Sequence, residues 1–263
     1  MAGSQCGSAT IAQVDGWPIN IANQDQAVEA ICSAAQRGES FATFTLNLDH
    51  IAKLRHDTSF REAYAKARFV TADGAPVARL ASRNGTTVLR TTGADLVEPL
   101  VEEAAGRGLP IYLCGSSPEV LTEARTRLSA LTGHRLDVVG ATSPQLGFDP
   151  TGSIADAELD RIVASGARLC FLALGSPKQE ILAARAVEKG IPVGFICVGA
   201  ALDFLVGHQA RAPKFMQDKG LEWLWRVTIN PRRLAPRYAS CALVLADLLI
   251  WRPFKLRLSR LSG

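Results

Sequence analysis

The sequence predicts an α/β protein built on a mostly parallel, Rossmann-like sheet with flanking helices. Short apolar runs alternate with helical patterns between residues 93 and 197. One of these runs, residues 169–174, contains no polar side chain except Cys170, as expected of a strand buried on both faces. Such alternation is typical of βαβ units. A small N-terminal hairpin and a basic helical C-terminal appendage complete the predicted architecture.

The N-terminal third predicts a hairpin and then the first strands of the sheet. Asp15-Gly16 separates two short apolar runs, which is the signal of a two-residue turn. Asp57-Thr58 is the expected break within a long helical stretch. The expected elements are hairpin strands 11–14 and 17–21, a helix 24–36, a strand 41–46, one or two helices within 48–67, a strand 68–72 and a helix to residue 82.

The rest of the chain divides into a regular part and an appendage. The regular part predicts helices 93–106, 118–131, 153–165 and 177–188, and strands 110–114, 135–140, 168–174 and 192–197. Residues 141–152 are rich in Pro and Gly and predict a loop near the edge of the sheet. Pro231 opens a further helix, which Pro236 is expected to interrupt or restart. We therefore predict a catalytic body, residues 1–210, and a C-terminal appendage, residues 211–263.

Composition and charge indicate a globular protein with an anionic partner at its C-terminus. Of the 263 residues, 48% are hydrophobic and 21% charged, a globular balance. The net charge is only +4, but from residue 214 onward ten Lys and Arg face three acids. This tail is apolar on one side and basic at both ends, which suits an anionic membrane surface. The alternative is an ordinary helix that packs on the body.

The cysteines and the apolar runs predict a cytoplasmic location. The six cysteines show neither a CxxC pair nor zinc-like spacing, as expected in a reducing compartment. The N-terminus lacks the features of a signal peptide. Residues 241–251 form the longest late apolar run, but Asp247 interrupts it and it is shorter than the ~20 residues of a spanning helix. We expect a protein that is peripherally associated with the inner face of the membrane.

Polar residues at predicted strand ends are the candidate site, because open parallel sheets bind ligands outside the carboxyl ends of their strands. Asp73 follows one strand, and Thr45 and Asn47 end another. Asp73 could be a simple helix N-cap or a general base with hydrogen-bonding neighbours. A third strand leads into residues 175–180, where Ser176 is expected to cap a helix whose first turn carries Gln179.

Several motifs are missing from the chain, and their absence narrows the chemistry. The sequence contains no GxGxxG, GxxxxGK[ST], HExxH or DxD, and its four histidines are scattered. We therefore expect no metal and no cofactor. Without a metal, Arg, Lys and helix N-termini would neutralise a diphosphate. The candidate cations are Arg90 and Lys178 of the body and, clustered with Trp223, Trp225 and Tyr238 in the appendage, Arg211, Arg226, Arg232, Arg233 and Arg237.

Five motifs in order resemble the WecG/TagA/CpsF glycosyltransferases, glycosyltransferase family 26. The motifs that carry the resemblance are TLNLDHIAKLRHDTSFREAYAKARFVTADGAPV, LRTTGADL, LALGSPKQE, VGAALDFLVGHQARAP and GLEWLWRVTINPRRLAPRY. The resemblance implies an inverting, metal-independent transfer from a UDP-sugar to an undecaprenyl-diphosphate-linked acceptor. The implied sugar is an N-acetylmannosamine type, a hexose or a hexuronic acid. It implies no nucleic-acid partner, and self-association into a homo-oligomer stays open.

The resemblance also implies roles for individual residues. Asp73 matches the proposed base of the family. The matches to substrate-binding residues are Thr45, Asn47, Arg90, Gln179, Arg226, Arg232 and Arg237. Two rival functions stay open on the residues alone: a nucleotide-dependent oxidoreductase on a doubly wound sheet, and a non-enzymatic membrane adaptor that uses the basic tail.

Overall fold

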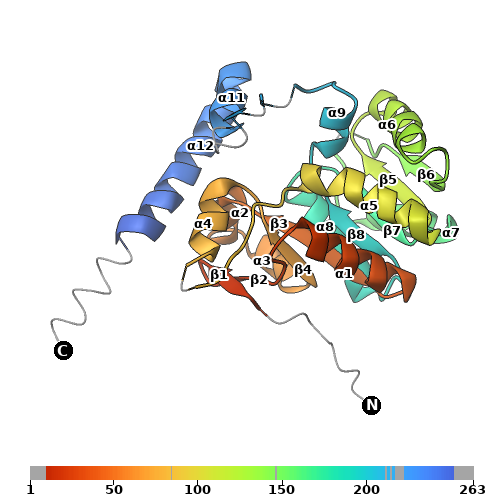
Figure 1. Cartoon of the computed structure of the whole chain (residues 1–263), viewed down its shortest axis with the longest axis horizontal. Coiled ribbons are helices and arrows are strands. Elements are labelled where there is room, and N and C mark those ends of the chain that lie inside the picture. Colours follow the sequence, from red (N-terminus) through yellow and green to blue (C-terminus); the bar gives the residue numbers. More distant parts are fainter. Residues whose placement is uncertain are drawn as a thin grey trace, which may run out of the picture.

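The protein is built around a six-stranded parallel sheet with the strand order β4-β3-β8-β7-β5-β6 (Figure 1). Our computed structural model describes residues 10–83, 85–145, 147–210, 212–213, 215–216 and 222–251, without the side chains of Arg226 and Arg233. The strands are β3 (Phe41–Leu46), β4 (Phe69–Ala72), β5 (Ile111–Gly115), β6 (Val138–Thr142), β7 (Leu169–Ala173) and β8 (Gly194–Cys197). The predicted α/β class is confirmed.

Helices cover both faces of the sheet (Figure 1). One face carries α1 (Gln24–Gln36), α5 (Gly93–Arg107), α6 (Pro118–Leu131) and α9 (Ala201–Leu205). The other carries α2 (Leu48–Leu54), α3 (Thr58–Ala65), α4 (Ala75–Ala81), α7 (Ser153–Ala164) and α8 (Lys178–Glu188). The predicted hairpin is present as β1 (Ala12–Val14) and β2 (Trp17–Ile19), and it packs on this second face.

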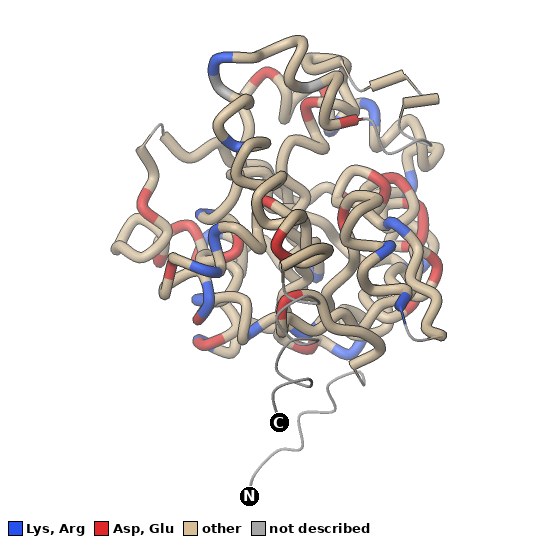
Figure 2. Tube along the Cα trace, turned by 90° about the vertical axis from the view of Figure 1, so that its left-hand side faces the viewer, with Lys and Arg blue, Asp and Glu red and all other residues tan. Residues whose placement is uncertain are grey.

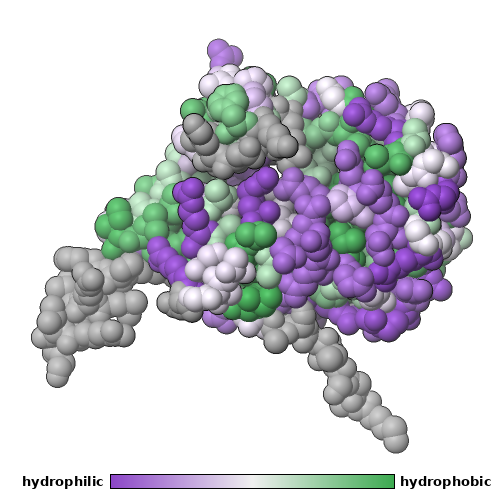
Figure 3. Space-filling model, in the orientation of Figure 1, coloured by the Kyte–Doolittle hydropathy of each residue, from purple (hydrophilic) through white to green (hydrophobic). Residues whose placement is uncertain are grey.

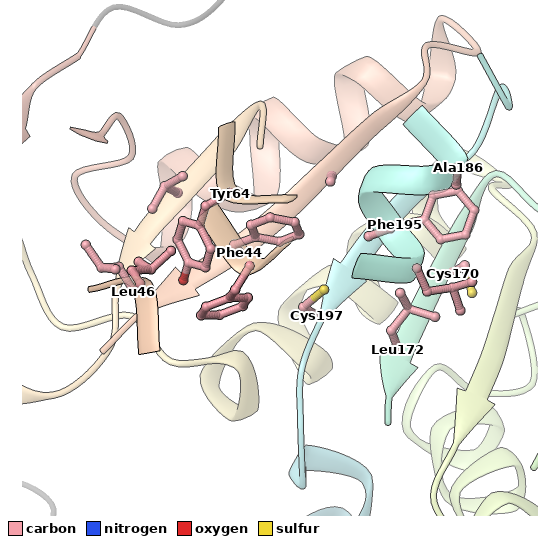
Figure 4. Close-up of a cluster of buried hydrophobic side chains, with 14 of the residues drawn as sticks. Phe44, Leu46, Tyr64, Cys170, Leu172, Ala186, Phe195 and Cys197 are labelled. Carbon is pink, nitrogen blue, oxygen red and sulfur yellow. The ribbon is translucent and has the colours of Figure 1, made fainter. Parts of the chain in front are cut away.

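The central strands are buried on both faces, as their apolar runs predict. Every residue of β3 and β7 is buried. Figure 4 shows aromatic rings of β3 and α3, such as Phe44 and Tyr64, in one cluster with the side chains of β7 and β8. Cys170 and Cys197 lie in this cluster as free thiols whose pKa is raised by burial. They therefore act as small hydrophobes rather than nucleophiles.

Most predicted boundaries lie within two residues of the observed ones, and the starts of β6 and α8 differ for local reasons. β6 begins at Val138 instead of residue 135, because its pairing starts opposite Ile111, where β5 begins. The predicted loop follows β6 at the edge of the sheet. α8 begins at Lys178, and Ser176 is not its cap. Pro177 occupies the N-cap position without a side-chain bond, and its carbonyl accepts from the amide of Ile181.

The C-terminal segment forms two helices beside α2. These are α11 (Glu222–Ile229) and α12 (Pro231–Ala246), which continues as the π-helical turn η1 (Asp247–Trp251) (Figure 1). Pro236 does not interrupt α12 as expected. The helix continues through Pro236 although a proline cannot donate a backbone hydrogen bond there, and it packs against α2.

The segment Leu234–Trp251 is long and apolar enough to cross a membrane by length and composition, and it is the sole such helix in the described part of the chain. This result differs from the expectation drawn from residues 241–251, because the helix extends unbroken from α12 into η1. The protein buries 17% of the segment, so it is not a core helix. Figure 3 shows its apolar surface along the side of the molecule.

Charged residues of both signs are interspersed along the described chain (Figure 2). Of the ten basic residues from position 214 onward, α11 and α12 contain Arg226, Arg232, Arg233 and Arg237. The other six lie outside the described residues, so the predicted basic cluster at the end of the chain stays a prediction.

Candidate active site

Asn47 and Asp73 meet where the adjacent strands β3 and β4 end. The two strands are parallel, and their register pairs Leu46 with Ala72. The residues that follow are therefore neighbours, and the Asp73 amide donates to the Leu46 carbonyl at 2.8 Å. The Asn47 side chain donates from Nδ2 to Oδ2 of Asp73 at 3.1 Å. The parallel register thus places a carboxylate and an amide together at the carboxyl edge of the sheet, where ligands bind.

Asp73 is not a helix cap. Gly74 occupies the N-cap position of α4 with φ of 87°, a conformation that favours glycine, and it makes no side-chain cap bond. Asn47 is the N-cap of α2, where its Oδ1 accepts from the amide of His50 at 2.8 Å. This bond leaves the Nδ2 of Asn47 pointing at Asp73. The N-cap interpretation of Asp73 is therefore wrong, and its role as a general base stays a prediction.

Arg90 reaches the same edge from the segment before α5. It forms a parallel bridge with Ala72, and the next residue, Thr91, donates its amide to the Ala72 carbonyl at 2.8 Å. Its Nη1 lies 3.1 Å from Oδ2 of Asp95, in the first turn of α5. Asp95 thereby holds the guanidinium at the carboxyl end of β4, beside Asp73.

Ion pairs hold α12 over this edge. Nη2 of Arg237 lies 3.1 Å from Oδ2 of Asp49, and Nζ of Lys53 lies 2.8 Å from the same oxygen. Burial opposes ionisation of Asp49, but Arg237 and Lys53 outweigh it and lower the pKa of this carboxyl. A second pair joins Arg55 of the α2 C-cap to Asp247 at 2.7 Å. Two charge pairs therefore fix α12 against α2.

A pocket of about 300 Å³ lies between the strand ends and the C-terminal helices. Four of the predicted site residues line it: Asn47, Asp73, Arg90 and Arg237. The remaining wall is mostly apolar and comes mainly from α2, α4, α11 and α12. The other lining residues are Leu48, Asp49, Gly74, Ala75, Pro76, Glu222, Trp223, Tyr238, Cys241, Ala242 and Leu245.

Two predicted site residues are buried in the body instead. Thr45 lies inside β3, and its carbonyl accepts a hydrogen bond from Tyr64. Gln179 is 4% exposed, and its Oε1 accepts from the amide of Gly199, the residue that leads from β8 towards α9. Gln179 thereby supports the loop at Gly199, and neither residue lines the pocket.

The remaining two residues are arginines of the C-terminal helices. Arg232 is exposed at the start of α12 and does not line the pocket. Arg226 belongs to α11, and its side chain lies outside the described residues.

A buried polar network lies beneath the pocket, and sequence reasoning missed it. Nδ1 of His50 lies 2.6 Å from the Tyr64 hydroxyl, and its Nε2 lies 3.8 Å from a carboxylate oxygen of Glu180. Burial raises the pKa of Glu180 to about 7, although a hydrogen bond from Gln179 acts to lower this pKa. Burial, together with Lys53, lowers the pKa of His50 to about 3. The network joins α2, α3 and α8, so the position of Asn47 depends on all three.

A second group of polar residues lies farther along the carboxyl edge, after β5. Gly115 has φ of 110°, and a Cβ there would meet the Ala173 backbone at 2.5 Å. The next residue, Ser116, also has a positive φ of 58°, and its hydroxyl donates to Asp203 of α9 at 3.1 Å. Non-glycine residues in this conformation concentrate at functional sites. The sequence signal was the GSS turn after a buried strand.

Within the described residues, no group of three or more His, Cys, Asp or Glu could hold a metal ion. Among the described side chains, the cations that line the pocket are Arg90 and Arg237. The Nε of Arg237 is buried without a hydrogen-bond partner among the described residues. A buried donor of this kind is expensive to leave unpaired, so it favours an anionic ligand in the pocket.

Comparison with known families identifies the class of this protein. The Glycosyl transferase WecG/TagA/CpsF family matches residues 12–259, nearly the whole chain. The chain therefore belongs to the WecG/TagA/CpsF family of glycosyl transferases. Its role is glycosyl transfer in cell-surface polysaccharide synthesis. Membership in this family favours neither of the two rival functions, the oxidoreductase and the adaptor.

Proposed function

We propose that the protein transfers a sugar from a UDP-sugar to an undecaprenyl-diphosphate-linked acceptor, with inversion and without a metal. The observation that carries the proposal is the convergence of Asn47, Asp73, Arg90 and Arg237 on one pocket. A base, an orienting amide and two guanidinium groups are what a metal-independent transfer from a diphosphate requires.

The proposed reaction is a single displacement. Asp73 accepts the proton of an acceptor hydroxyl while that oxygen attacks the anomeric carbon of the donor. The bond between the anomeric carbon and the diphosphate oxygen breaks, and UDP leaves with the bonding electron pair. The Asn47 amide holds the Asp73 carboxylate in place through its 3.1 Å hydrogen bond. Arg90 and Arg237 stabilise the negative charge that develops on the diphosphate.

The donor nucleotide is proposed to lie along the carboxyl edge beyond the pocket. Ser116 and Asp203 lie after β5, and the Gly199 loop lies after β8. β8 separates β3 from β7 in the sheet, so these groups continue the edge that begins at Asp73. A nucleoside diphosphate placed along this edge points its sugar towards Asp73.

The lipid-linked acceptor is proposed to arrive by way of α12 and η1. Leu243, Leu249 and Ile250 are 62%, 46% and 62% exposed. The ion pairs of Arg55 with Asp247 and of Arg237 with Asp49 hold the helix to the body. This docking supports a helix that lies on the cytoplasmic face of the membrane instead of crossing it. Co-sedimentation of the protein with lipid vesicles that contain or lack anionic lipid tests this proposal.

The decisive experiment measures UDP release from a panel of UDP-sugars, with a short-chain sugar-diphosphate-lipid acceptor and EDTA. The proposal predicts release that needs both one donor and the acceptor, and that EDTA leaves unchanged. Release that requires an added divalent cation would overturn metal independence. If the folded protein releases no UDP from any of the donors, even with native lipid extract as acceptor, the proposed substrates are wrong.

A further inference from the structure

The pocket at Asp73 has two chemically different walls. The strand ends supply the polar wall, with Asp73, Asn47 and Arg90. The opposite wall carries Trp223 of α11 and Tyr238 of α12. The two aromatic rings lie 6.0 Å apart between centroids, with 49° between their planes. They form a single angled surface, which we name the aromatic pair.

Trp223 is 45% exposed although it lies at a pocket that holds charged groups. Burying the face of an indole against apolar atoms is energetically favourable, and nearly half of the Trp223 side chain is left exposed to solvent. A pyranose ring is suited to such a place, because it has hydroxyl groups on its edge and C–H groups on its faces. Its C–H face can pack on the aromatic pair while its hydroxyl groups reach the polar wall.

We propose that the aromatic pair is the platform on which the acceptor's sugar ring packs, with its reacting hydroxyl directed at Asp73. This inference rests on the proposed function and names the occupant of the pocket. The acceptor is favoured over the donor because the base must touch the acceptor hydroxyl. The pocket's 300 Å³ is also at the lower limit for small-molecule sites, which suits one sugar ring better than a nucleotide-sugar.

The position of the aromatic pair also separates sugar recognition from lipid recognition. Arg237 lies one residue before Tyr238 and lines the same pocket, where the proposed reaction assigns its guanidinium to the leaving diphosphate. The exposed apolar residues Leu243, Leu249 and Ile250 lie farther along the same helix. The helix therefore carries one ring of the aromatic pair at the pocket and an apolar stretch beyond it. The sugar of a lipid-linked acceptor can meet the first while its lipid meets the second.

The test compares Trp223→Leu with wild type on acceptors that share the sugar but differ in chain length. We expect the variant to raise the acceptor KM by about ten-fold or more, equally for short and long chains, with the donor KM unchanged. Trp223→Phe is expected to recover most of the loss, because it restores an aromatic face. The matched control is Trp225→Leu, since Trp225 lies on the same helix as Trp223 but outside this pocket.

Three outcomes would overturn the inference while leaving the proposed function intact. They are an unchanged acceptor KM in Trp223→Leu, a loss that grows with chain length, and an equal loss in Trp225→Leu. The second would show that the aromatic pair contacts lipid, and the third that any tryptophan of α11 matters. Circular dichroism of each variant checks that it is folded.

A binding measurement tests the platform independently of turnover. In a Trp251→Phe background, we expect the acceptor analogue alone to quench tryptophan fluorescence, and we expect Trp223→Leu to remove this quenching. If wild-type protein transfers no sugar but the quenching occurs and depends on Trp223, the platform stands and the proposed reaction fails. If no quenching occurs, the platform is wrong.

Discussion

Asn47 connects a helix cap to a carboxylate: its Oδ1 accepts from the amide of His50, and its Nδ2 donates to Asp73 at 3.1 Å. Both bonds come from one side-chain amide, but they use different atoms: Oδ1 makes the cap and Nδ2 makes the bond to Asp73. The cap stabilises α2, whereas the second bond orients the proposed base. Substitutions at this pair can therefore separate folding from catalysis.

Replacement of the base is the first prediction. Asp73→Asn removes the proton acceptor but keeps the size of the side chain. We expect turnover to fall by about 10²- to 10⁴-fold, with the melting temperature close to that of wild type. The measurement is UDP release under saturating donor and acceptor, with thermal unfolding of the same samples. A folded variant that keeps the wild-type rate would assign the base to another group.

Asn47 allows the cap and the amide to be tested apart. Asn47→Ser keeps a good N-cap residue but loses Nδ2, so we expect stability near wild type and a clear loss of turnover. Asn47→Ala loses both functions, and we expect it to cost about 1 kcal/mol of unfolding free energy as well. Urea unfolding and turnover of the two variants make the comparison. Equal turnover in Asn47→Ser and wild type would show that the bond to Asp73 does not matter.

The docking of α12 is predicted to support activity. Asp247→Asn weakens the pair with Arg55, which lies outside the pocket of Asp73. We expect faster proteolysis of α12 and a partial loss of turnover. Arg237→Gln removes a pocket cation and the pair with Asp49, so we expect a larger loss of turnover. Limited proteolysis and steady-state kinetics on both variants test this order, and a larger loss in Asp247→Asn would contradict it.

Glu180 is predicted to make stability depend on pH. The folded state keeps its carboxyl protonated up to about pH 7, whereas the ordinary pKa is 4.5. The unfolded state therefore binds fewer protons between these values, and folding becomes less favourable as the pH rises through about 7. The difference between the two pKa values corresponds to a change of about 3 kcal/mol in the free energy of unfolding. His50 acts in the opposite sense, because its lowered pKa costs stability only as the pH falls below its ordinary 6.5.

Glu180→Gln isolates this effect, because glutamine does not ionise and His50 is common to both proteins. Urea unfolding at about pH 5 and about pH 8 is the measurement. We expect wild type to lose stability relative to the variant over this range. Parallel curves for the two proteins would mean that Glu180 is already ionised in the folded state at the lower pH.

Much of the fold follows from local patterns in the sequence. The apolar runs of β3 and β7 predict strands buried on both faces, and both are wholly buried. The Asp15-Gly16 turn predicts the hairpin. Two predictions from local patterns were wrong. Ser176 does not cap α8, and Pro236 does not break α12, because the surrounding backbone and packing decide where a helix begins and whether it continues.

Some residues of the candidate site were also predictable from the sequence, and others were not. Asp73 and Asn47 are predictable because polar residues directly follow apolar strands. Trp223 and Tyr238 stand out in the sequence only as aromatic residues near arginines, and the burial of Gln179 has no sequence signal. Asp49 is missed because its partner Arg237 lies in a distant helix.

By itself, the sequence determined the elements, the chemical groups at the strand ends and the family, because each depends on short-range patterns or on motifs in order. Only the tertiary structure decided that Asp73, Arg90 and Arg237 share one pocket and that His50, Tyr64 and Glu180 lie buried beneath it. Strand order and the docking of α12 depend on how distant apolar faces and charges pack together, and no local pattern in the chain specifies that packing.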